Sequence, residues 1–320
     1  MAIGRVHHAY LFDGPDGVGK ERAAFGLAQG LVCERRGDGG DDACGVCSAC
    51  ARAVKRPDGS SVMDKSAGAR PVHPDILVLE RGLYEPAQIG RRAPESQDIS
   101  IDQVRTLVLA RAAFPPHEGR AKVFIVRRAE ELSIAAANAL LKTLEEPGKS
   151  TYFILLTSQP DTLLPTIRSR TQRVRFAALP DPVVAKVLAD EGMDAELARK
   201  IAALAGGSAR EALTLADPEE SVKREEFVTR ALDALRAPDL GKGLELAEEA
   251  KKEKAGLDLR LLALATRLAE EARSAATLGD SRADAIIARY RLALAAARQL
   301  DGNASPQLVI ESMIIRMRGA

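Results

Sequence analysis

The 320-residue sequence contains no tryptophan, and aromatic residues make up only 3% of it. Its core must therefore be built from leucine, isoleucine, valine and alanine, a composition that suits helices. Basic and acidic residues nearly balance, 46 against 45, so contact with nucleic acid depends on a local patch or on partner proteins. The sequence has no apolar run with the length of a signal peptide or a membrane span, which predicts a cytoplasmic protein without membrane contact.

Cysteine is confined to one short stretch of the chain. All four cysteines lie within residues 33–50, and the last three are spaced C-x2-C-x2-C. Four thiolates in one loop suit a tetrahedral zinc ion, and a site closed by four protein ligands is structural. An iron–sulfur cluster and four unliganded thiols are the alternatives, since disulfides do not suit a reducing cytoplasm. The expected zinc ligands are Cys33, Cys44, Cys47 and Cys50.

Strand-like and helix-like segments alternate over the first 177 residues, which predicts an α/β domain with a parallel sheet. Two irregular segments, 56–70 and 81–97, interrupt the pattern and are predicted to be insertions, the first of them mobile. Ser100 and Ser133 are expected to cap helices. The predicted strands are 8–13, 74–79, 122–126, 152–157 and 173–176, and the predicted helices are 21–32, one after Ser100, 134–146 and a short one within 161–170.

The pattern changes after Pro180, where the strand signals stop. Residues 179–218 contain short helical segments interrupted by glycines, which predicts a small helical domain. From residue 219 to 320, segments rich in Ala, Leu, Glu, Lys and Arg predict a bundle of four or five helices. The expected division is therefore an α/β domain over 1–178, a small helical domain over 179–218 and an all-helical domain over 219–320.

The sequence GPDGVGK at residues 14–20 lies between a predicted strand and a predicted helix. Glycines there let successive backbone N–H groups face a phosphate, and the helix N-terminus adds a favourable dipole. The next residue should be Ser or Thr to bind magnesium but is Glu21, which repels phosphate unless magnesium or a nearby arginine compensates. A glycine-rich turn without nucleotide is therefore the alternative. The candidate phosphate-binding residues are Gly14, Gly17, Gly19 and Lys20.

Two arginines, Arg127 and Arg128, follow the strand predicted over 122–126. In a P-loop protein, acidic residues at this strand end hold magnesium and orient the attacking water. Two cations there, together with Glu21, remove the groups that phosphoryl transfer needs. The chain is therefore expected to lack ATPase activity of its own.

A third candidate element is Arg168-Ser169-Arg170-Thr171, which follows the strand predicted over 152–157. An arginine on a surface loop is by default a solvated charge, but its planar guanidinium can also act on a γ-phosphate held by another subunit. Spacing alone does not decide between these interpretations. The histidines show no paired ligand spacing and are expected to be packing or surface residues: His7, His8, His73 and His117.

Together these segments resemble the bacterial DNA polymerase III clamp-loader family, and within it the delta-prime type of subunit. The resemblance rests on HAYLFDGPDGVGK, the cysteine cluster, HPD at 73–75, NALLKTLEEP at 138–147 and the Arg-Ser-Arg-Thr element. NALLKTLEEP with a following Ser-Arg is highly specific, whereas the phosphate loop alone is not. The resemblance continues through 207–210 and is weaker toward the C-terminus, where NASPQLVIESMIIRM is similar to the end of the family's collar domain.

The resemblance implies an AAA+ P-loop module, a small helical lid at 179–218 and a helical collar at 219–320 that joins other subunits in an open ring. It implies that Arg170 is an arginine finger acting in trans, and that Thr157 (or Ser158) and Arg210 are sensor residues. The chain would be a non-catalytic subunit of the polymerase holoenzyme. The implied partners are the tau/gamma motor subunits, the delta subunit, the sliding clamp that the ring opens with ATP, and the primed DNA on which the clamp is placed.

The sequence departs from the family's motor subunits, which carry Lys-Thr or Lys-Ser in the phosphate loop and Asp-Glu after the third strand. It has Glu21, Arg127 and Arg128 at these places, and Thr171 where the family usually has Cys. A family segment that helps enclose adenine is also shortened, with only seven residues ahead of the first strand. The expected function is a stator that stimulates a neighbour's ATPase. The alternatives are a motor subunit, a free-standing P-loop kinase or ATPase, and a structural zinc-binding interaction protein.

Overall fold

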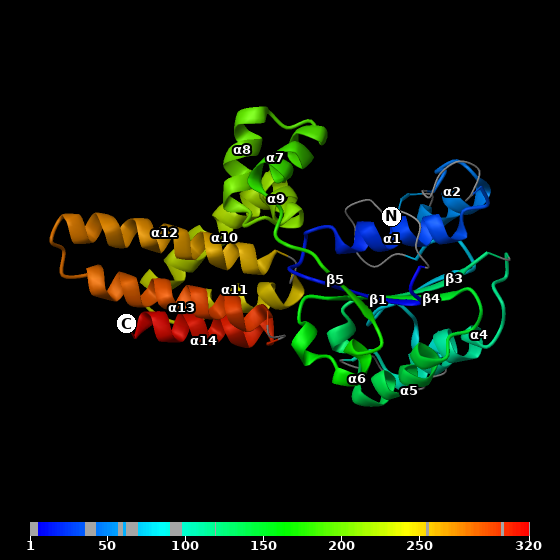
Figure 1. Cartoon of the computed structure of the whole chain (residues 1–320). Helices are drawn as coiled ribbons and strands as arrows, with labels where there is room; N and C mark the ends of the chain where they lie inside the picture. The colour runs from blue at the N-terminus through cyan, green and yellow to red at the C-terminus, as the bar shows by residue number, and fades with distance from the viewer. Residues whose placement is uncertain are drawn as a thin grey trace. The chain divides into compact units, whose positions relative to one another are not determined.

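The computed structural model of this chain describes residues 6–35, 43–56, 60–61, 70–89, 98–118, 120–253, 256–301 and 304–319. The chain divides into two compact units, one of Met1–Val184 with Gly206–Arg210 and one of Ala185–Ala205 with Glu211–Ala320. The first contains the sheet, and the second consists of helices (Figure 1). None of the helices in the described ranges is long and apolar enough to cross a membrane.

The first unit is built on a five-stranded parallel sheet in the order β2-β3-β4-β1-β5, which confirms the expected α/β class. Its strands lie within two residues of the predicted bounds. Because all the strands are parallel, their carboxyl ends meet at one edge of the sheet, where ligands bind in α/β folds. The strands are β1 (Ala9–Asp13), β2 (Ile76–Leu79), β3 (Lys122–Val126), β4 (Thr151–Thr157) and β5 (Gln172–Arg175).

Helices cover both faces of this sheet (Figure 1). α1 (Lys20–Val32) and α2 (Ser48–Val54) lie on one face, and α5 (Ile134–Glu145) and α6 (Pro165–Arg168) lie on the other. The sequence predicted α1 and α5 to within one residue but did not predict α2, which lies inside the cysteine segment. The sheet is therefore buried on both sides, as its continuous apolar strands require.

Neighbouring residues in the strands point to opposite faces and fill two separate cores. Ile125 and Ile154 pack with α1 and α2, whereas Phe124 and Phe153 pack with α5. The rings of Phe124 and Phe153 stack at a centroid distance of 5.1 Å. This alternation follows from the two-residue period of a strand and holds the register of β3 against β4.

Serine side chains begin two of the helices, as the sequence predicted. Ser133 Oγ accepts a hydrogen bond from the Ala136 N–H at 3.2 Å, and Ser100 Oγ accepts one from the Gln103 N–H at 3.3 Å. The Gln103 amide donates to the Glu80 carbonyl at 3.1 Å, which ties this helix to the end of β2. The helix after Ser100 comprises α3 (Ile101–Gln103), a π-helical segment (Val104–Leu109) and α4 (Ala110–Ala112).

Most of the two predicted insertions lies outside the described residues, so the expected mobility of residues 56–70 stays a prediction. In the described part of the first, Ser61 forms an antiparallel bridge with Lys55, the residue before the insertion. The described part of the second includes a short 3-10 helix, Pro86–Ile89.

The second unit is helical, as the sequence predicted for the C-terminal part of the chain. Its core is apolar and includes Leu261, Leu264, Ile310 and Met313. The division into a lid and a collar at residue 218 remains a prediction. The helices from residue 181 onward are α7 (Asp181–Asp190), α8 (Ala195–Leu204), α9 (Ala209–Ala216), α10 (Pro218–Arg236), α11 (Gly241–Lys252), α12 (Leu257–Thr277), α13 (Ala283–Asp301) and α14 (Pro306–Arg318).

The packing of α5 yields the first prediction. Leu140 is fully buried between α5 and the sheet, so Leu140→Ala should lower the free energy of unfolding of this unit by about 2–5 kcal/mol. The measurement is urea unfolding followed by circular dichroism. Ile134→Ala, on the same helix but 73% exposed, is the matched control and should change the free energy by less than about 0.5 kcal/mol. Equal losses in the two variants would contradict the orientation of α5.

Candidate functional site

The turn between β1 and α1 is the predicted phosphate loop, and its lysine is held by the loop itself. Lys20 is buried at the start of α1, and its Nζ donates to the carbonyl oxygens of Gly14 and Pro15, at 2.7 Å for Pro15. Nζ also lies 3.3 Å from a carboxylate oxygen of Asp16. Three oxygens of the loop thus match the three donors of the ammonium group. Gly19 precedes Lys20 in the left-handed region of backbone space.

Residues 206–210 lie against the phosphate loop. Gly17 has a φ of 78°, and a Cβ at this position would lie 2.0 Å from the Oγ of Ser208. The Gly17 carbonyl accepts a hydrogen bond from the Ala209 N–H at 3.0 Å. The predicted sensor residue Arg210 also lies against Gly17. A Cβ added at Gly17 would be 2.9 Å from the Cβ of Arg210. Glycine is therefore required at residue 17 for space as well as for conformation.

The guanidinium of Arg127 lies at the end of β3, where a P-loop ATPase would have carboxylates. It is buried and forms ion pairs with two glutamates, Glu80 at the end of β2 and Glu21 in the first turn of α1. Arg127 Nη1 lies 2.7 Å from Glu80 Oε2, and the Phe25 ring lies 5.7 Å from the guanidinium carbon. Arg127 thus neutralises Glu21, which is the compensation expected for a glutamate beside a phosphate loop, and it joins α1 to two strands.

The second arginine of the pair points elsewhere. Arg128 has a φ of 47°, and its side chain is 52% exposed. Its Nε lies 2.8 Å from a carboxylate oxygen of Glu131, three residues along the chain. In the described part of the chain, the pairing with Glu21 is therefore made by Arg127.

Two further polar residues end strands at this edge. Thr157, a predicted sensor residue, is buried at the end of β4, and its Oγ1 accepts a hydrogen bond from the Gln159 N–H at 3.0 Å. Asp13, at the end of β1, accepts hydrogen bonds from Arg173 Nε at 2.9 Å and Nη2 at 2.6 Å. The hydrogen bond from Arg173 lowers the pKa of Asp13. Lys20, Arg127 and Arg173 are thus each paired with carboxylates of the same chain.

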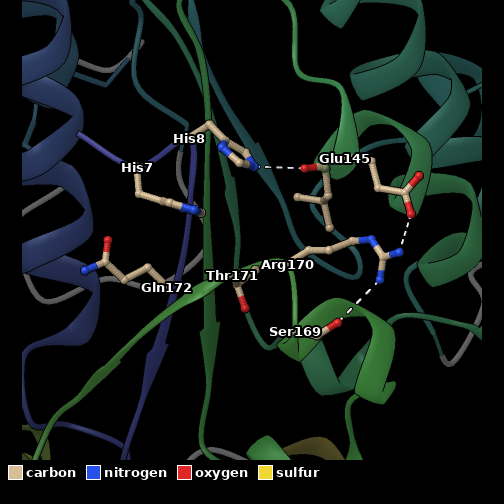
Figure 2. A pocket seen from close by; sticks show the side chains of 8 residues that line it. His7, His8, Glu145, Ser169, Arg170, Thr171 and Gln172 are labelled. Carbon is tan, nitrogen blue, oxygen red and sulfur yellow. Dashed lines mark hydrogen bonds and ion pairs between the residues drawn. The ribbon is translucent and has the colours of Figure 1, made fainter. Parts of the chain in front are cut away.

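Arg170 lies in the turn after α6, beside an open pocket of about 490 Å³. The pocket is formed by the N-terminal histidines, the end of α5 and residues 169–172 (Figure 2). Arg170 Nη2 pairs with the carboxylate of Glu145, and Nη1 donates to the Thr166 carbonyl at 2.9 Å. The side chain of Arg170 is 34% exposed. The structure therefore places this arginine at the surface, away from the ion pairs around Arg127.

Three residues of these sites were missed in the sequence. His8 Nε2 hydrogen-bonds to the Leu144 carbonyl at 2.9 Å and lines the Arg170 pocket, although the sequence gave no sign of a partner. Glu80 directly follows β2, and its position at the end of a parallel strand was the available signal. Glu145 lies in the LEEP segment, residues 144–147, and the sequence indicated no partner for it.

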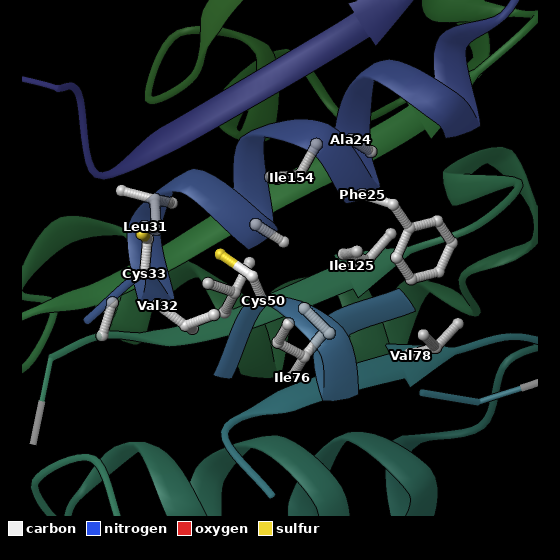
Figure 3. Packing of buried hydrophobic residues seen from close by; sticks show 14 of the residues in the cluster. Ala24, Phe25, Leu31, Val32, Cys33, Cys50, Ile76, Val78, Ile125 and Ile154 are labelled. Atoms are coloured by element: carbon white, nitrogen blue, oxygen red, sulfur yellow. The ribbon is translucent and has the colours of Figure 1, made fainter. Parts of the chain in front are cut away.

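The sulfur atoms of the four cysteines gather in one cluster. Each lies within 4.8 Å of the others, and those of Cys44 and Cys50 are 3.9 Å apart. A tetrahedral zinc ion with Zn–S bonds of about 2.3 Å separates its sulfurs by about 3.8 Å, so the four cysteines can hold a metal ion. Cys33 follows α1 and Cys50 lies in α2. Both pack into the core between these helices and the sheet (Figure 3).

Backbone N–H groups also point at these sulfurs. Cys47 N–H lies 3.3 Å from Cys44 Sγ, and Cys50 N–H lies 3.4 Å from Cys47 Sγ. Hydrogen bonds from the backbone of Cys47 and Val46 lower the pKa of the Cys44 thiol, whereas burial raises the pKa of Cys50. Such donors stabilise thiolates, the form in which cysteine binds metal.

The HPD segment at 73–75 connects the cysteine module to the sheet. The Asp75 carboxylate accepts hydrogen bonds from the backbone N–H groups of His117 and Glu118, at 2.6 and 2.8 Å. The Glu118 carboxylate pairs with Arg52 in α2 and lies 3.3 Å from His73 Nε2. Burial lowers the pKa of His73, which favours its neutral form. These contacts give the segment a structural role.

The family model described as "DNA polymerase III, delta subunit" matches residues 1–180, more than half of the chain. The chain belongs to this family. Subunit delta' of DNA polymerase III from Pseudomonas aeruginosa is 38% identical over 208 residues, which are 63% of this chain and 53% of that protein. The delta' subunit of Bacillus subtilis is 30% identical over 233 residues, 72% of this chain and 60% of that protein.

Similarity to a second type of subunit is of the same order. The gamma/tau subunit of DNA polymerase III from Mycobacterium tuberculosis is 32% identical over 248 residues, 75% of this chain and 38% of that protein. This delta-family chain therefore spans less than two thirds of the length of each of these relatives. Overall identity does not separate the delta' type from the gamma/tau type, so the residues of the site must do so.

The ion pairs of Arg127 yield a prediction that contrasts neighbouring arginines of this delta-family chain. Arg127→Met should lower the free energy of unfolding by about 2–4 kcal/mol, because it leaves Glu21 and Glu80 without their shared partner. Arg128→Met removes a half-exposed ion pair and should cost less than about 1 kcal/mol. Thermal and urea unfolding measure both. Equal effects would show that Arg127 does not hold α1 to the strands.

Proposed function

We propose that this chain is the delta-prime, or stator, subunit of a DNA polymerase III clamp loader. It would join tau/gamma motor subunits and a delta subunit in a ring that uses ATP to load the sliding clamp onto primed DNA. Membership of the delta subunit family and the similarity to delta' subunits support this assignment. In this role the chain contributes to ATP hydrolysis by a neighbour and performs none itself.

The observation that carries the proposal is the pairing of Arg127 with Glu21 and Glu80. Magnesium-dependent phosphoryl transfer needs a hydroxyl and a carboxylate on the metal and a group that orients water. Here Glu21 takes the place of the hydroxyl, and a guanidinium takes the place of the carboxylate. The gamma/tau role, which the similarity in sequence also suggests, requires both of these groups, so the site favours the delta-prime role.

The trans-acting residue in this proposal is Arg170. An arginine finger must be displayed on the surface, and Arg170 lies in an exposed turn held by α6 and by the end of α5. Its guanidinium would stabilise the charge that develops on a γ-phosphate bound by the neighbouring subunit. In the same proposal the sensor residues are Thr157, which lies at the end of β4, and Arg210, which lies beside the phosphate loop.

We assign the metal of the cysteine cluster as one structural zinc ion per chain. Four thiolates leave no open coordination position, and zinc prefers such tetrahedral sulfur sites. The ion would hold the segment 33–50 and α2 against the core around α1. Its chemistry is to cross-link the chain, and it takes no part in hydrolysis.

The zinc assignment predicts one equivalent of zinc by elemental analysis of the purified chain. A chelator should remove the zinc and increase hydrogen exchange in residues 33–50, because the metal no longer links the four cysteines. Cys47→Ser should lower the zinc content. Val46→Ser, at the adjacent residue whose side chain is 75% exposed, should retain the full equivalent. Iron in place of zinc, or no metal at all, would contradict the assignment.

The trans role predicts that Arg170→Ala reduces the DNA-stimulated ATPase of the reconstituted complex about 10³-fold at the affected site. The reason is that no guanidinium then stabilises the charge on the γ-phosphate in the transition state. The fold of the chain should be unchanged. Arg168→Ala removes a neighbouring arginine of similar exposure that pairs with Asp161, and it should change the rate less than about twofold. Full ATPase activity with Arg170→Ala would refute the trans role.

A further inference from the structure

Both terminal nitrogens of Arg170 are bound within its own chain. Nη2 pairs with the Glu145 carboxylate, and Nη1 donates to the Thr166 carbonyl at 2.9 Å and lies 3.4 Å from Ser169 Oγ. Figure 2 shows the guanidinium turned toward Glu145 at the end of α5. Arginine binds a phosphate most strongly through two parallel N–H groups. While Glu145 holds Nη2, Arg170 cannot offer that pair of terminal donors to another subunit.

The backbone at Glu145 is held in place by its neighbours, which limits the positions that the Glu145 carboxylate can reach. The preceding residue, Leu144, is 1% exposed in the core beneath α5. Its carbonyl also hydrogen-bonds to His8 at 2.9 Å, which ties the last turn of α5 to the residue before β1. Pro147 then prevents the helix from continuing. Glu145 is therefore held at the edge of the pocket, with its side chain 47% exposed.

The strength of this contact sets what it can do. An ion pair between partly exposed groups shifts an equilibrium by at most about fivefold. An arginine acting in trans on a phosphate accelerates transfer by about 10³- to 10⁵-fold. Glu145 is thus too weak to keep Arg170 from a correctly placed γ-phosphate. A contact of this strength can bias Arg170 toward its own chain only while no well-placed phosphate competes for the guanidinium.

We propose that Glu145 is a positioning residue for Arg170, holding the guanidinium on its own chain and thereby lowering the basal ATPase rate of the assembled complex. The exchange involves no covalent step, since the guanidinium leaves one anion, the Glu145 carboxylate, for another, the γ-phosphate. This role rests on the proposed function of Arg170 in trans. It makes the LEEP segment part of the control of the neighbour's site, in addition to its part in the core.

The contact is testable first in the isolated full-length chain, without ATPase activity. Phenylglyoxal modifies arginine side chains that are free to react, and peptide mass spectrometry reports the labelling rate of Arg170. Glu145→Gln should raise that rate two- to fivefold, because the neutral amide holds the guanidinium less strongly. Glu146→Gln makes the same change of charge at the next, exposed residue and should leave the rate unchanged. Equal rates in wild type and Glu145→Gln would overturn the contact.

The reconstituted complex then tests the consequence for hydrolysis. Without DNA, Glu145→Gln should raise the ATPase rate two- to fivefold, and Glu146→Gln should not. With clamp and primed DNA present, the rates of Glu145→Gln and wild type should converge. In an Arg170→Ala background, Glu145→Gln should have no effect, because its target is gone.

The outcomes separate the two claims. Full activity with Arg170→Ala refutes the trans role and, with it, the role of Glu145 in hydrolysis. A large loss with Arg170→Ala, combined with a basal rate at or below wild type for Glu145→Gln, overturns the inference about Glu145 alone and leaves the proposed function standing. Thermal unfolding of Glu145→Gln is expected within about 4 °C of wild type, the most that loss of one exposed ion pair would cause, and such a result shows that the variant is folded.

Discussion

The ion pairs between the buried Arg127 and two partly exposed glutamates organise the functional edge of this sheet. A guanidinium taken out of water needs carboxylates close by, and Glu21 and Glu80 supply them from α1 and β2. Two of the three departures from the ATPase pattern, Glu21 and Arg127, therefore form one ion-paired unit, whereas Arg128 pairs with Glu131. Glu21 without Arg127 would place an unpaired negative charge beside the phosphate loop, and Arg127 without its glutamates would be a buried, uncompensated cation. Either change alone would be costly, whereas together they bind α1 to the sheet through ion pairs.

The same logic extends along the edge. Lys20 donates to oxygens of its own loop, and Arg173 pairs with Asp13. Ser208 lies close to Gly17 in the same loop. A nucleotide would have to displace these contacts before it met the cations that normally bind phosphates. The position of Arg170 is different, because its guanidinium lies in an exposed turn and its ion pair with Glu145 is accessible to water. The cations around the phosphate loop are thus paired within the chain, whereas Arg170 lies at the surface.

Much of this could be predicted from the sequence, because it depends on local patterns. The apolar runs gave the strands, Ser133 marked the start of α5, and the cysteine spacing indicated one cluster. What the sequence did not reveal are contacts between residues far apart in the chain. His8 meets the carbonyl of Leu144 across 136 positions, and Arg127 meets Glu80 across 47. No periodicity encodes such pairs, since they arise only when the parallel strands bring their ends together.

The central claim is that Arg127, Glu21 and Glu80 have replaced the metal and nucleotide of an ATPase site. The most direct measurement is an equilibrium titration of the purified full-length chain with a fluorescent ATP analogue, with and without Mg²⁺, together with an assay of phosphate release. If the ion pairs close the site, the chain alone shows no saturable magnesium-dependent binding and no hydrolysis. Magnesium-dependent binding in the micromolar range with turnover of ATP would contradict this claim and favour a motor subunit of the gamma/tau type.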